Sequence, residues 1–353
     1  MTKPVILTGI RANNDLTIGN YFGAILPIID MAKKHSDDYQ INMFIPDLHS
    51  FTTPIDHTKL YEQTINNAKL FVAAGLPIDN QNIFMYRQSF IPAHSELTII
   101  LDSFTGFGEM SRMIQFKDKS NSVGADRTSL GLFNYPVLMA SDILLYNAKY
   151  VPVGDDQSQH LEFTRDIAQR MNSKFNELFV VPDSVKNQHE FFGKDQGLRI
   201  MDLINPIKKM SKSDDSGRGV IFLNDNPVIA AKKVMGATTD DKAKINFDRD
   251  NQPGISNLLE ILSLLQGVTL QSVTDQFKGQ TNYGDFKKVV AGEVEKFLTD
   301  FQKKLVEVDE NTVITKLEQS ERDLTPIANA TLSRVQQAVG LRPNTGDITR
   351  SEG

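Results

Sequence analysis

Short apolar runs alternate with longer amphipathic stretches in the first half of the chain. Residues 5–10, 41–47 and 82–86 form mainly apolar runs, and each is followed by polar residues. Runs of this length are typical of strands that are buried on both faces of a sheet. Between the second and third runs, residues 58–75 carry apolar side chains at helical spacing and end at a glycine.

The same alternation continues up to about residue 214. Helical spacing runs through residues 92–107 and 133–146, and residues 150–153 form a fourth apolar run before a helix that contains His160. Strand and helix in alternation predict an α/β fold with a doubly wound parallel sheet, the Rossmann-like arrangement, covered by helices on both faces.

Polar helical patterns replace this alternation in the rest of the chain, at residues 226–236, 256–266, 286–308 and 311–340. Amphipathic helices of this kind predict a small antiparallel bundle. We therefore expect a Rossmann-like domain over residues 1–214, a C-terminal α-helical domain over 215–341 and a flexible tail over 342–353.

Composition adds only general limits to this picture. The 353 residues are 40% hydrophobic and 23% charged, as in ordinary globular proteins. We expect no membrane association, because no apolar run is long enough to span a bilayer and the start of the chain shows no signal-peptide pattern. The absence of cysteine is compatible with a cytoplasmic location. A net charge of -6 argues against non-specific coating of nucleic acid, although a local basic face remains possible.

The clearest candidate chemistry lies in residues 208–213, Lys-Lys-Met-Ser-Lys-Ser. Lys209 and Lys212 place two ammonium groups three residues apart on a segment rich in serine. Lysines act as movable point charges, which suits a polyanion whose charge changes during a reaction. A solvated basic turn is the alternative interpretation, but two upstream stretches, 17–20 and 154–157, favour the same kind of ligand.

Each of these upstream stretches follows a predicted strand and precedes a predicted helix. Gly19 lies where backbone N–H groups at a helix start would face a phosphate, and its missing Cβ would permit close approach. Residues 154–157, Gly-Asp-Asp-Gln, lie at a strand tip, where ligands of doubly wound sheets bind. The alternatives are a glycine needed only for packing in the first stretch and an acidic N-cap in the second.

Asp142 is a carboxylate in the most apolar helical pattern of the protein. Helical spacing places it on the same face as Met139. A carboxylate there is costly unless it is paired. One possibility is a structural role, in which it caps neighbouring backbone N–H groups or pairs with an arginine. The other is that it lies in a pocket and accepts a hydrogen bond from a substrate, and the residues alone leave both open.

Taken together, the three stretches resemble the bacterial-type tryptophanyl-tRNA synthetases, a family of class I aminoacyl-tRNA synthetases. Thr17-Ile18-Gly19-Asn20 resembles the first nucleotide-binding signature of that class, and residues 209–213 match the second, Lys-Met-Ser-Lys-Ser. Both signatures in this order, on either side of a Gly-Asp-Asp-Gln strand tip, form a highly specific combination. The similarity covers nearly the whole chain.

The resemblance implies a reaction that needs no enzyme nucleophile. The tryptophan carboxylate attacks the α-phosphate of ATP, pyrophosphate leaves, and the aminoacyl group is then transferred to the 3′ end of tRNA(Trp). A carboxylate is already ionised at neutral pH, so the enzyme acts by positioning and by stabilising the charge on pyrophosphate. The family implies ATP, Mg²⁺ held by the ATP phosphates, L-tryptophan and tRNA(Trp) as ligands, and a homodimer with the tRNA crossing between subunits. The apolar residues 135–146 are compatible with an interface.

Carried over to this sequence, the family's ATP contacts are Arg11, Ala12, Asn13, Gly19, Asn20, Gly154, Asp155, Asp156, Ile200, Lys209, Met210, Ser211, Lys212 and Ser213. Its tryptophan contacts are Leu7, Gly9, His49, Tyr135, Met139, Asp142, Val151, Val153 and Gln157. The catalytic set is Lys209, Ser211, Lys212, Asn20 and Gln157. Asp142 is the position that would accept the indole N–H, with Met139 and Val151 as candidate walls that exclude tyrosine by shape.

The first loop departs from the family pattern. Residues 11–14 read Arg-Ala-Asn-Asn where the family has Gln-Pro-Ser-Gly, and Asp155 replaces a more common glutamate. Three other functions remain to be considered: a tyrosyl-tRNA synthetase, a nucleotidylyltransferase of related fold, and a non-catalytic RNA-binding paralogue. The helical C-terminal pattern argues against the second, and intact Lys209 and Lys212 argue against the third.

Overall fold

A four-stranded parallel sheet forms the centre of the N-terminal part of the chain. The computed structural model describes residues 3–9, 16–117, 128–154, 157–193, 200–211 and 217–343. Strands β1 (Val5–Gly9), β2 (Gln40–Ile45), β3 (Ile83–Arg87) and β4 (Ala148–Tyr150) lie in the order β3-β2-β1-β4. All three strand pairs are parallel, which confirms the predicted sheet.

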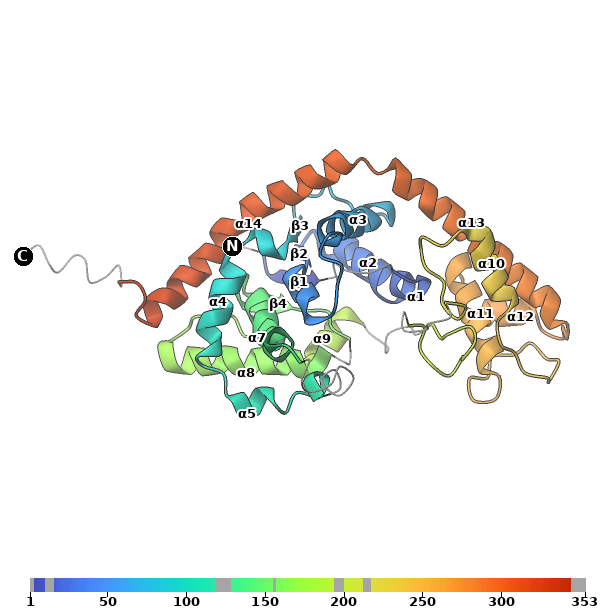
Figure 1. Ribbon diagram of the computed structural model, residues 1–353, viewed down its shortest axis with the longest axis horizontal. Helices are drawn as coiled ribbons and strands as arrows, with labels where there is room; N and C mark the ends of the chain where they lie inside the picture. Colours follow the sequence, from blue (N-terminus) through green and yellow to red (C-terminus); the bar gives the residue numbers. More distant parts are fainter. Residues whose placement is uncertain are drawn as a thin grey trace, which may run out of the picture.

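Helices cover both faces of this sheet (Figure 1). Along β1, Ile6 belongs to the core shared with α2 and α3, whereas Leu7 belongs to the core shared with α4, α7 and α8. Alternate side chains of a strand point to opposite faces, so two separate cores confirm a doubly wound arrangement. The covering helices are α2 (Leu26–His35), α3 (Leu60–Ala73), α4 (Ala93–Asp102), α5 (Phe107–Met110), α7 (Leu130–Leu144), α8 (Ser158–Phe175) and α9 (Val185–Phe192).

The fourth strand begins and ends earlier than its sequence predicts. It pairs with β1 over residues 148–150, and the predicted strand residues Val151 to Val153 lie beyond it. Val151 and Val153 are nevertheless buried, and the N–H of Val151 donates to the side-chain amide oxygen of Gln188 at 3.0 Å. The side chain of Gln188 therefore provides the partner that a neighbouring strand would otherwise supply.

The helix after β1 contains an irregular turn. It begins as α1 (Ile18–Asn20), continues as a π-helical turn over Tyr21–Ile25 and then becomes α2. The N–H of Leu26 bonds to the carbonyl of Tyr21, five residues back. Pro27 follows directly and has no N–H to donate, which accounts for the wider turn at this point.

The helical part of the chain packs around one largely buried helix. It comprises α10 (Pro227–Met235), α11 (Pro253–Gln266), α12 (Leu270–Gln276) and α13 (Tyr283–Glu307). Residues 254–263 of α11 are all buried, and α13 packs against both α10 and α11. The predicted helices are present, whereas α12 is an addition: of its seven residues only Val273 is buried, so its apolar pattern is weak. The bundle touches the first helix of the chain through Tyr21, whose ring lies 5.0 Å from that of Phe297.

The last helix, α14 (Glu310–Ala338), returns from the helical part to the sheet and runs along the edge strand β3 (Figure 1). The N–H of Met85 donates to Ser320 Oγ, and the N–H of Arg87 donates to Glu321 Oε1. The guanidinium of Arg87 also forms two bonds of 2.7 Å with the Glu321 carboxylate. Side chains of α14 thus satisfy the edge of the sheet. The division at residue 214 stays a prediction.

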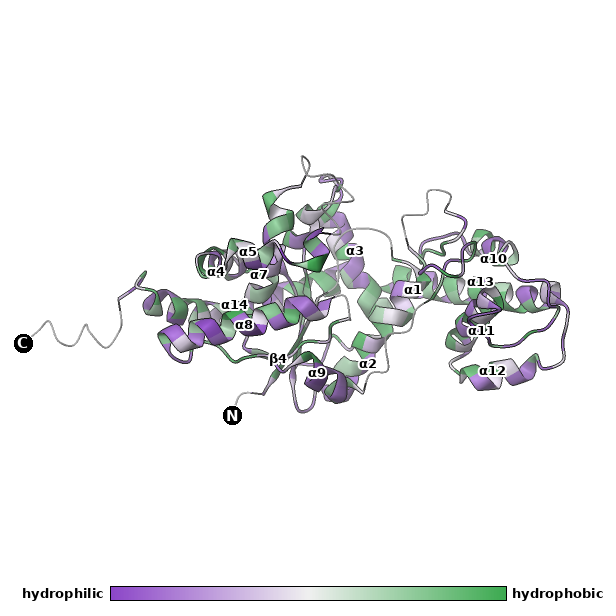
Figure 2. Ribbon diagram, turned by 90° about the horizontal axis from the view of Figure 1, so that it is seen from below, coloured by the Kyte–Doolittle hydropathy of each residue, from purple (hydrophilic) through white to green (hydrophobic). Residues whose placement is uncertain are grey.

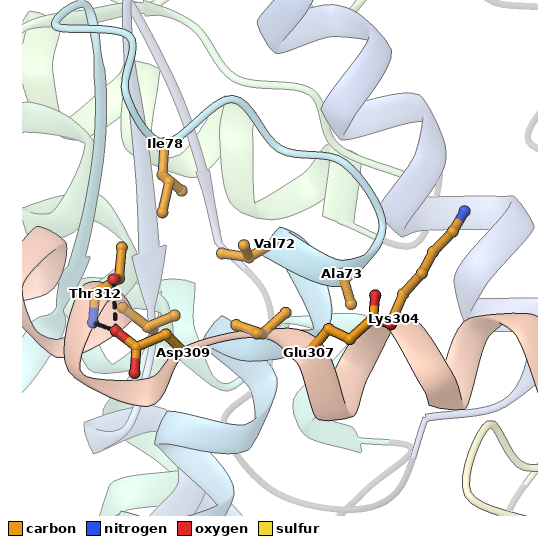
Figure 3. A pocket seen from close by; sticks show the side chains of 9 residues that line it. Val72, Ala73, Ile78, Lys304, Glu307, Asp309 and Thr312 are labelled. Atoms are coloured by element: carbon orange, nitrogen blue, oxygen red, sulfur yellow. Dashed lines mark hydrogen bonds between the residues drawn. The ribbon is translucent and has the colours of Figure 1, made fainter.

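The link between α13 and α14 packs against α3. Asp309 is the N-cap residue of α14, and its carboxylate accepts hydrogen bonds from the N–H and the hydroxyl of Thr312, at 2.9 and 2.6 Å (Figure 3). Lys69 of α3 lies 3.2 Å from Glu310. A cavity of about 370 Å³ beside this link is lined by Val72, Ala73, Ile78, Lys304, Glu307, Val308, Asp309, Thr312 and Val313. None of the predicted site residues lines it.

Hydropathy along the ribbon agrees with this packing. In Figure 2, α14 alternates between hydrophilic and hydrophobic residues, as expected for a helix with one buried face. Over the described ranges, no helix has the length and apolarity needed to cross a membrane.

Replacing Glu321 with alanine is expected to lower the free energy of unfolding by about 3–5 kcal/mol, because the buried Arg87 guanidinium would lose its partner. Glu318 of the same helix is the matched control: its side chain is 52% exposed and lies 3.9 Å from Arg322. Its alanine variant is expected to lose less than about 1 kcal/mol. Urea denaturation followed by circular dichroism measures both, and equal losses would show that the buried pair does not anchor α14.

Candidate active site

Asp142 lies at the centre of a polar cluster at the carboxyl ends of the strands. It is on α7 and fully buried. Its Oδ1 accepts from Gln88 Nε2 at 2.7 Å and from His94 Nδ1 at 2.6 Å, and its Oδ2 accepts from His49 Nε2 at 2.8 Å. His49 follows β2, Gln88 follows β3, and His94 is on α4. Four elements therefore converge on one carboxylate.

These donors decide the charge of Asp142. Burial by itself would raise the pKa of the carboxyl, but the hydrogen bonds from His49 and His94 outweigh burial, so the pKa lies below its usual value. Asp142 therefore remains an anion at neutral pH. A buried anion with oriented donors on one side is suited to accept a further hydrogen bond from a ligand.

Tyr135 and Met139 lie on the same helix as Asp142, towards its N-terminal side. The Tyr135 ring is 6.3 Å from the His49 ring, edge to face, and its hydroxyl lies 2.8 Å from His160 Nε2 of α8. Met139 is half-buried. The structure thus brings Asp142, His49 and Tyr135 together, as their shared role predicts.

Other predicted members of this pocket lie on the surrounding strand ends. Leu7, Val151 and Val153 are buried in the core on the α7 side of the sheet. Gly9 ends β1, and a Cβ built on it would lie 2.6 Å from the ring of Phe44, so only glycine fits there. Gln157 is the N-cap residue directly before α8, and its N–H donates to the carbonyl of Gly154 at 2.9 Å.

Four further residues belong to this cluster although no sequence motif includes them: Gln88, His94, Tyr146 and His160. Gln88 follows a strand directly, which is a signal for a site residue in a doubly wound sheet. His94 and Tyr146 lie in predicted apolar helices, where a polar side chain is usually a packed core group. Only the folded structure shows that Tyr146 Oη lies 2.9 Å from His94 Nε2.

The two predicted phosphate-binding segments lie side by side. A Cβ built on Gly19 would lie 3.6 Å from Ile200 Cβ and 4.0 Å from Met210 Cβ. Backbone bonds support this arrangement: the N–H of Ile18 donates to Ile221 at 3.0 Å, and that of Met210 donates to Ile200 at 3.0 Å. Lys209 precedes Met210 and is exposed, as is Ser211. The glycine-bearing turn and the lysine segment therefore border the same region.

Asn20 has a structural role at the start of the helix. Its Oδ1 accepts the N–H of Thr17 at 3.0 Å, while its own N–H donates to Thr17 Oγ1 at 3.2 Å. This reciprocal pair is a capping box. A helix-capping role for Asn20 is thus compatible with its predicted place beside ATP.

Seven predicted site residues lie outside the described residues: Arg11, Ala12, Asn13, Asp155, Asp156, Lys212 and Ser213. Their predicted contacts with ATP stay predictions. Within the described ranges, no group of three or more His, Cys, Asp or Glu side chains is arranged to hold a metal ion.

Comparison with known proteins identifies relatives along nearly the whole chain. The model of the tRNA synthetases class I (W and Y) matches residues 2–299. A tryptophan–tRNA ligase from Caldanaerobacter subterraneus is 42% identical over 336 residues, which cover 95% of this chain and 98% of the relative.

Solved structures give the same result. The crystal structure of tryptophanyl-tRNA synthetase from Mycoplasma pneumoniae has a TM-score of 0.80 at 34% identity and covers 97% of this chain and 99% of its own. That of the Campylobacter jejuni enzyme, complexed with ADP and tryptophan, has a TM-score of 0.76 at 28% identity and covers 95% and 99% of the two chains.

The lowered pKa of Asp142 predicts a pH-dependent contribution to stability. Because the folded-state pKa lies below the usual value of 3.8, ionised Asp142 stabilises the folded state above that pH, and this stabilisation is lost as pH falls through the lowered pKa. The difference in unfolding free energy between the natural protein and Asp142→Asn should be largest near about pH 6 and shrink below about pH 4. Urea titrations across this range measure it, and a constant difference would contradict the prediction.

Proposed function

The chain belongs to the class I tRNA synthetases for tryptophan and tyrosine, and from this premise we propose that the site around Asp142 selects tryptophan and that the region between Gly19 and Lys209 binds ATP. Its activity is that of a tryptophan–tRNA ligase, since relatives with this activity match nearly the full chain. The observation that supports the amino-acid site is the buried, ionised carboxylate of Asp142 with its donors on neighbouring strand ends.

Activation of tryptophan requires positioning rather than covalent catalysis. An oxygen of the tryptophan carboxylate attacks the α-phosphorus of ATP, the bond to the bridging oxygen breaks, and pyrophosphate leaves with the electron pair. A ribose hydroxyl at the tRNA 3′ end then attacks the carbonyl of the adenylate and releases AMP. The chain has to align the reactants and stabilise the charge that grows on pyrophosphate.

Asp142 supplies selectivity in this scheme. The indole N–H would donate to the remaining acceptor position of its carboxylate, whereas phenylalanine would bury that position without a donor. Sites built around such a hydrogen bond reject an analogue that lacks the donor by a factor on the order of 10⁴–10⁵. Met139 and Val151 would exclude tyrosine by shape.

The ATP site would combine the start of α1 with the exposed lysine segment. Gly19 is half-buried and has no side chain of its own, which would allow a ligand to approach the backbone closely, and Lys209 is exposed. Ser211, and Lys212 and Ser213 from outside the described residues, would complete the segment. We propose that Mg²⁺ is held mainly by the ATP phosphates. Bound there, the ion would neutralise phosphate charge.

The remaining proposals concern assembly and location. We propose a homodimer, supported by exposed apolar side chains on neighbouring segments: Phe107 on α5 is 76% exposed and Leu130 on α7 is 86% exposed. The ring of Phe133 joins them, 5.1 Å from Phe107. Most of the predicted interface helix beyond Phe133 is buried in the chain's own core. We further propose that the helical part binds the tRNA(Trp) anticodon and that the protein acts in the cytoplasm.

A pyrophosphate-exchange assay with each of the twenty amino acids tests the substrate. Tryptophan is expected to drive exchange of labelled pyrophosphate into ATP, because only its indole N–H matches the Asp142 carboxylate. Asp142→Ala should lose tryptophan-dependent exchange and discriminate less against phenylalanine. Exchange driven by tyrosine and not by tryptophan would contradict the assignment.

Replacing Lys209 with alanine is expected to lower the maximal exchange rate by about 10²–10³, because its charge would stabilise the departing pyrophosphate. The KM for tryptophan should change little, since the ammonium would not contact the indole. The control is Lys208→Ala, an equally exposed neighbour outside the matched signature, which should stay within about twofold. Equal effects of the two substitutions would contradict a specific role for Lys209.

A further inference from the structure

We propose that His94 is a positioning residue for amino-acid selection: together with Gln88 it occupies Oδ1 of Asp142, so that Oδ2 is the oxygen that faces the indole N–H. This inference rests on the proposed function. It adds His94 as a residue that orients Asp142, and it assigns Oδ2 as the oxygen that accepts from the indole N–H. His94 has no place in the set of contacts carried over from the family resemblance.

The His94 ring donates to Asp142 through Nδ1. An ionised carboxylate only accepts hydrogen bonds, so the proton between Asp142 Oδ1 and His94 Nδ1, 2.6 Å apart, must be on Nδ1. Burial raises the pKa of Tyr146 well above its usual value, so its hydroxyl keeps its proton and can donate to His94 Nε2 at 2.9 Å. Tyr146 therefore fixes the ring with Nδ1 as the donor.

Most acceptor positions of the Asp142 carboxylate are filled by donors from the chain. A carboxylate offers about four lone-pair positions, two on each oxygen. Gln88 and His94 fill both positions on Oδ1, and His49 fills one on Oδ2. Among the described residues, these donors leave one position, and it lies on Oδ2.

The two oxygens of Asp142 differ in how closely the protein surrounds them. The side chains of His94 and Asp142 are fully buried, whereas the side chain of His49 is 19% exposed. The Oδ1 side of the carboxylate is thus closed by protein, and the Oδ2 side lies next to the partly exposed imidazole. A ligand that enters beside His49 and Tyr135 reaches Oδ2 first.

Aromatic rings pack around the imidazole of His94. Its ring lies 6.1 Å from the ring of Tyr86, 6.4 Å from that of Phe44 and 5.6 Å from that of Tyr146. With aromatic rings on several sides, the imidazole has little freedom to turn, and it holds Asp142 in one orientation.

The test compares tryptophan with its isostere in which sulfur replaces the indole N–H. Both analogues fill the same volume, but only tryptophan can donate to Oδ2. In His94→Leu, we expect the preference for tryptophan, measured as the ratio of the two kcat/KM values in pyrophosphate exchange, to fall by about ten- to a hundredfold. His94→Asn, which keeps a donor near the position of Nδ1, should retain most of the preference.

Two further variants make the result decisive. Thr98→Val is the packing control. Thr98 is buried on the same helix as His94, and its hydroxyl donates a hydrogen bond to Ser141 Oγ at 3.0 Å rather than to Asp142. This variant should leave the ratio within about twofold. If His94→Leu does not fold, Tyr146→Phe removes the hydroxyl that fixes the His94 ring and should lower the ratio by about three- to tenfold.

The possible failures are distinguishable. If the natural protein shows no tryptophan-dependent exchange, the proposed function itself is wrong. If tryptophan drives exchange but His94→Leu lowers kcat/KM for both analogues in proportion, with an unchanged ratio, His94 is only structural and the inference is overturned. The same conclusion follows if Tyr146→Phe leaves the ratio unchanged.

Discussion

A single buried negative charge constrains much of the catalytic part of this protein. Asp142 lies in the most apolar helix of the chain, where an unpaired carboxylate would cost several kcal/mol. Its donors come from the end of β2, the end of β3 and the helix α4. These three elements must therefore meet α7 in one arrangement, and that arrangement is also the proposed amino-acid site. In this proposal, stability of the charge and recognition of the substrate depend on the same contacts.

The same strand end connects this site to the last helix. Arg87 forms its buried bidentate pair with Glu321 of α14, and the next residue, Gln88, donates to Asp142. A short path of direct contacts thus leads from α14 through the end of β3 to the carboxylate of Asp142. The start of α14 adjoins α13 and hence the helical part, so two regions far apart in sequence share one structural support.

The sequence predicted the parallel sheet and most helices because their periodicity is set by local burial. It also predicted Asp142, His49 and Tyr135, through resemblance to a family. It did not predict His94 or Tyr146, because a polar side chain in an apolar helix gives no indication of its partner across the core. The weakly amphipathic helix α12 and the early end of β4 were missed for a related reason. Their limits depend on contacts such as that of Val151 with Gln188, which no local pattern encodes.

The packing of α14 against β3 has a consequence for how the chain is made. Arg87 and Glu321 are 234 positions apart, so the sheet is complete long before the helix that protects its outer strand has left the ribosome. During that interval the nascent chain presents an unpaired strand, which is a template for pairing with other chains. Premature termination within the last helix would make this transient exposure permanent, and such fragments are expected to be prone to aggregation even though they contain every strand of the sheet.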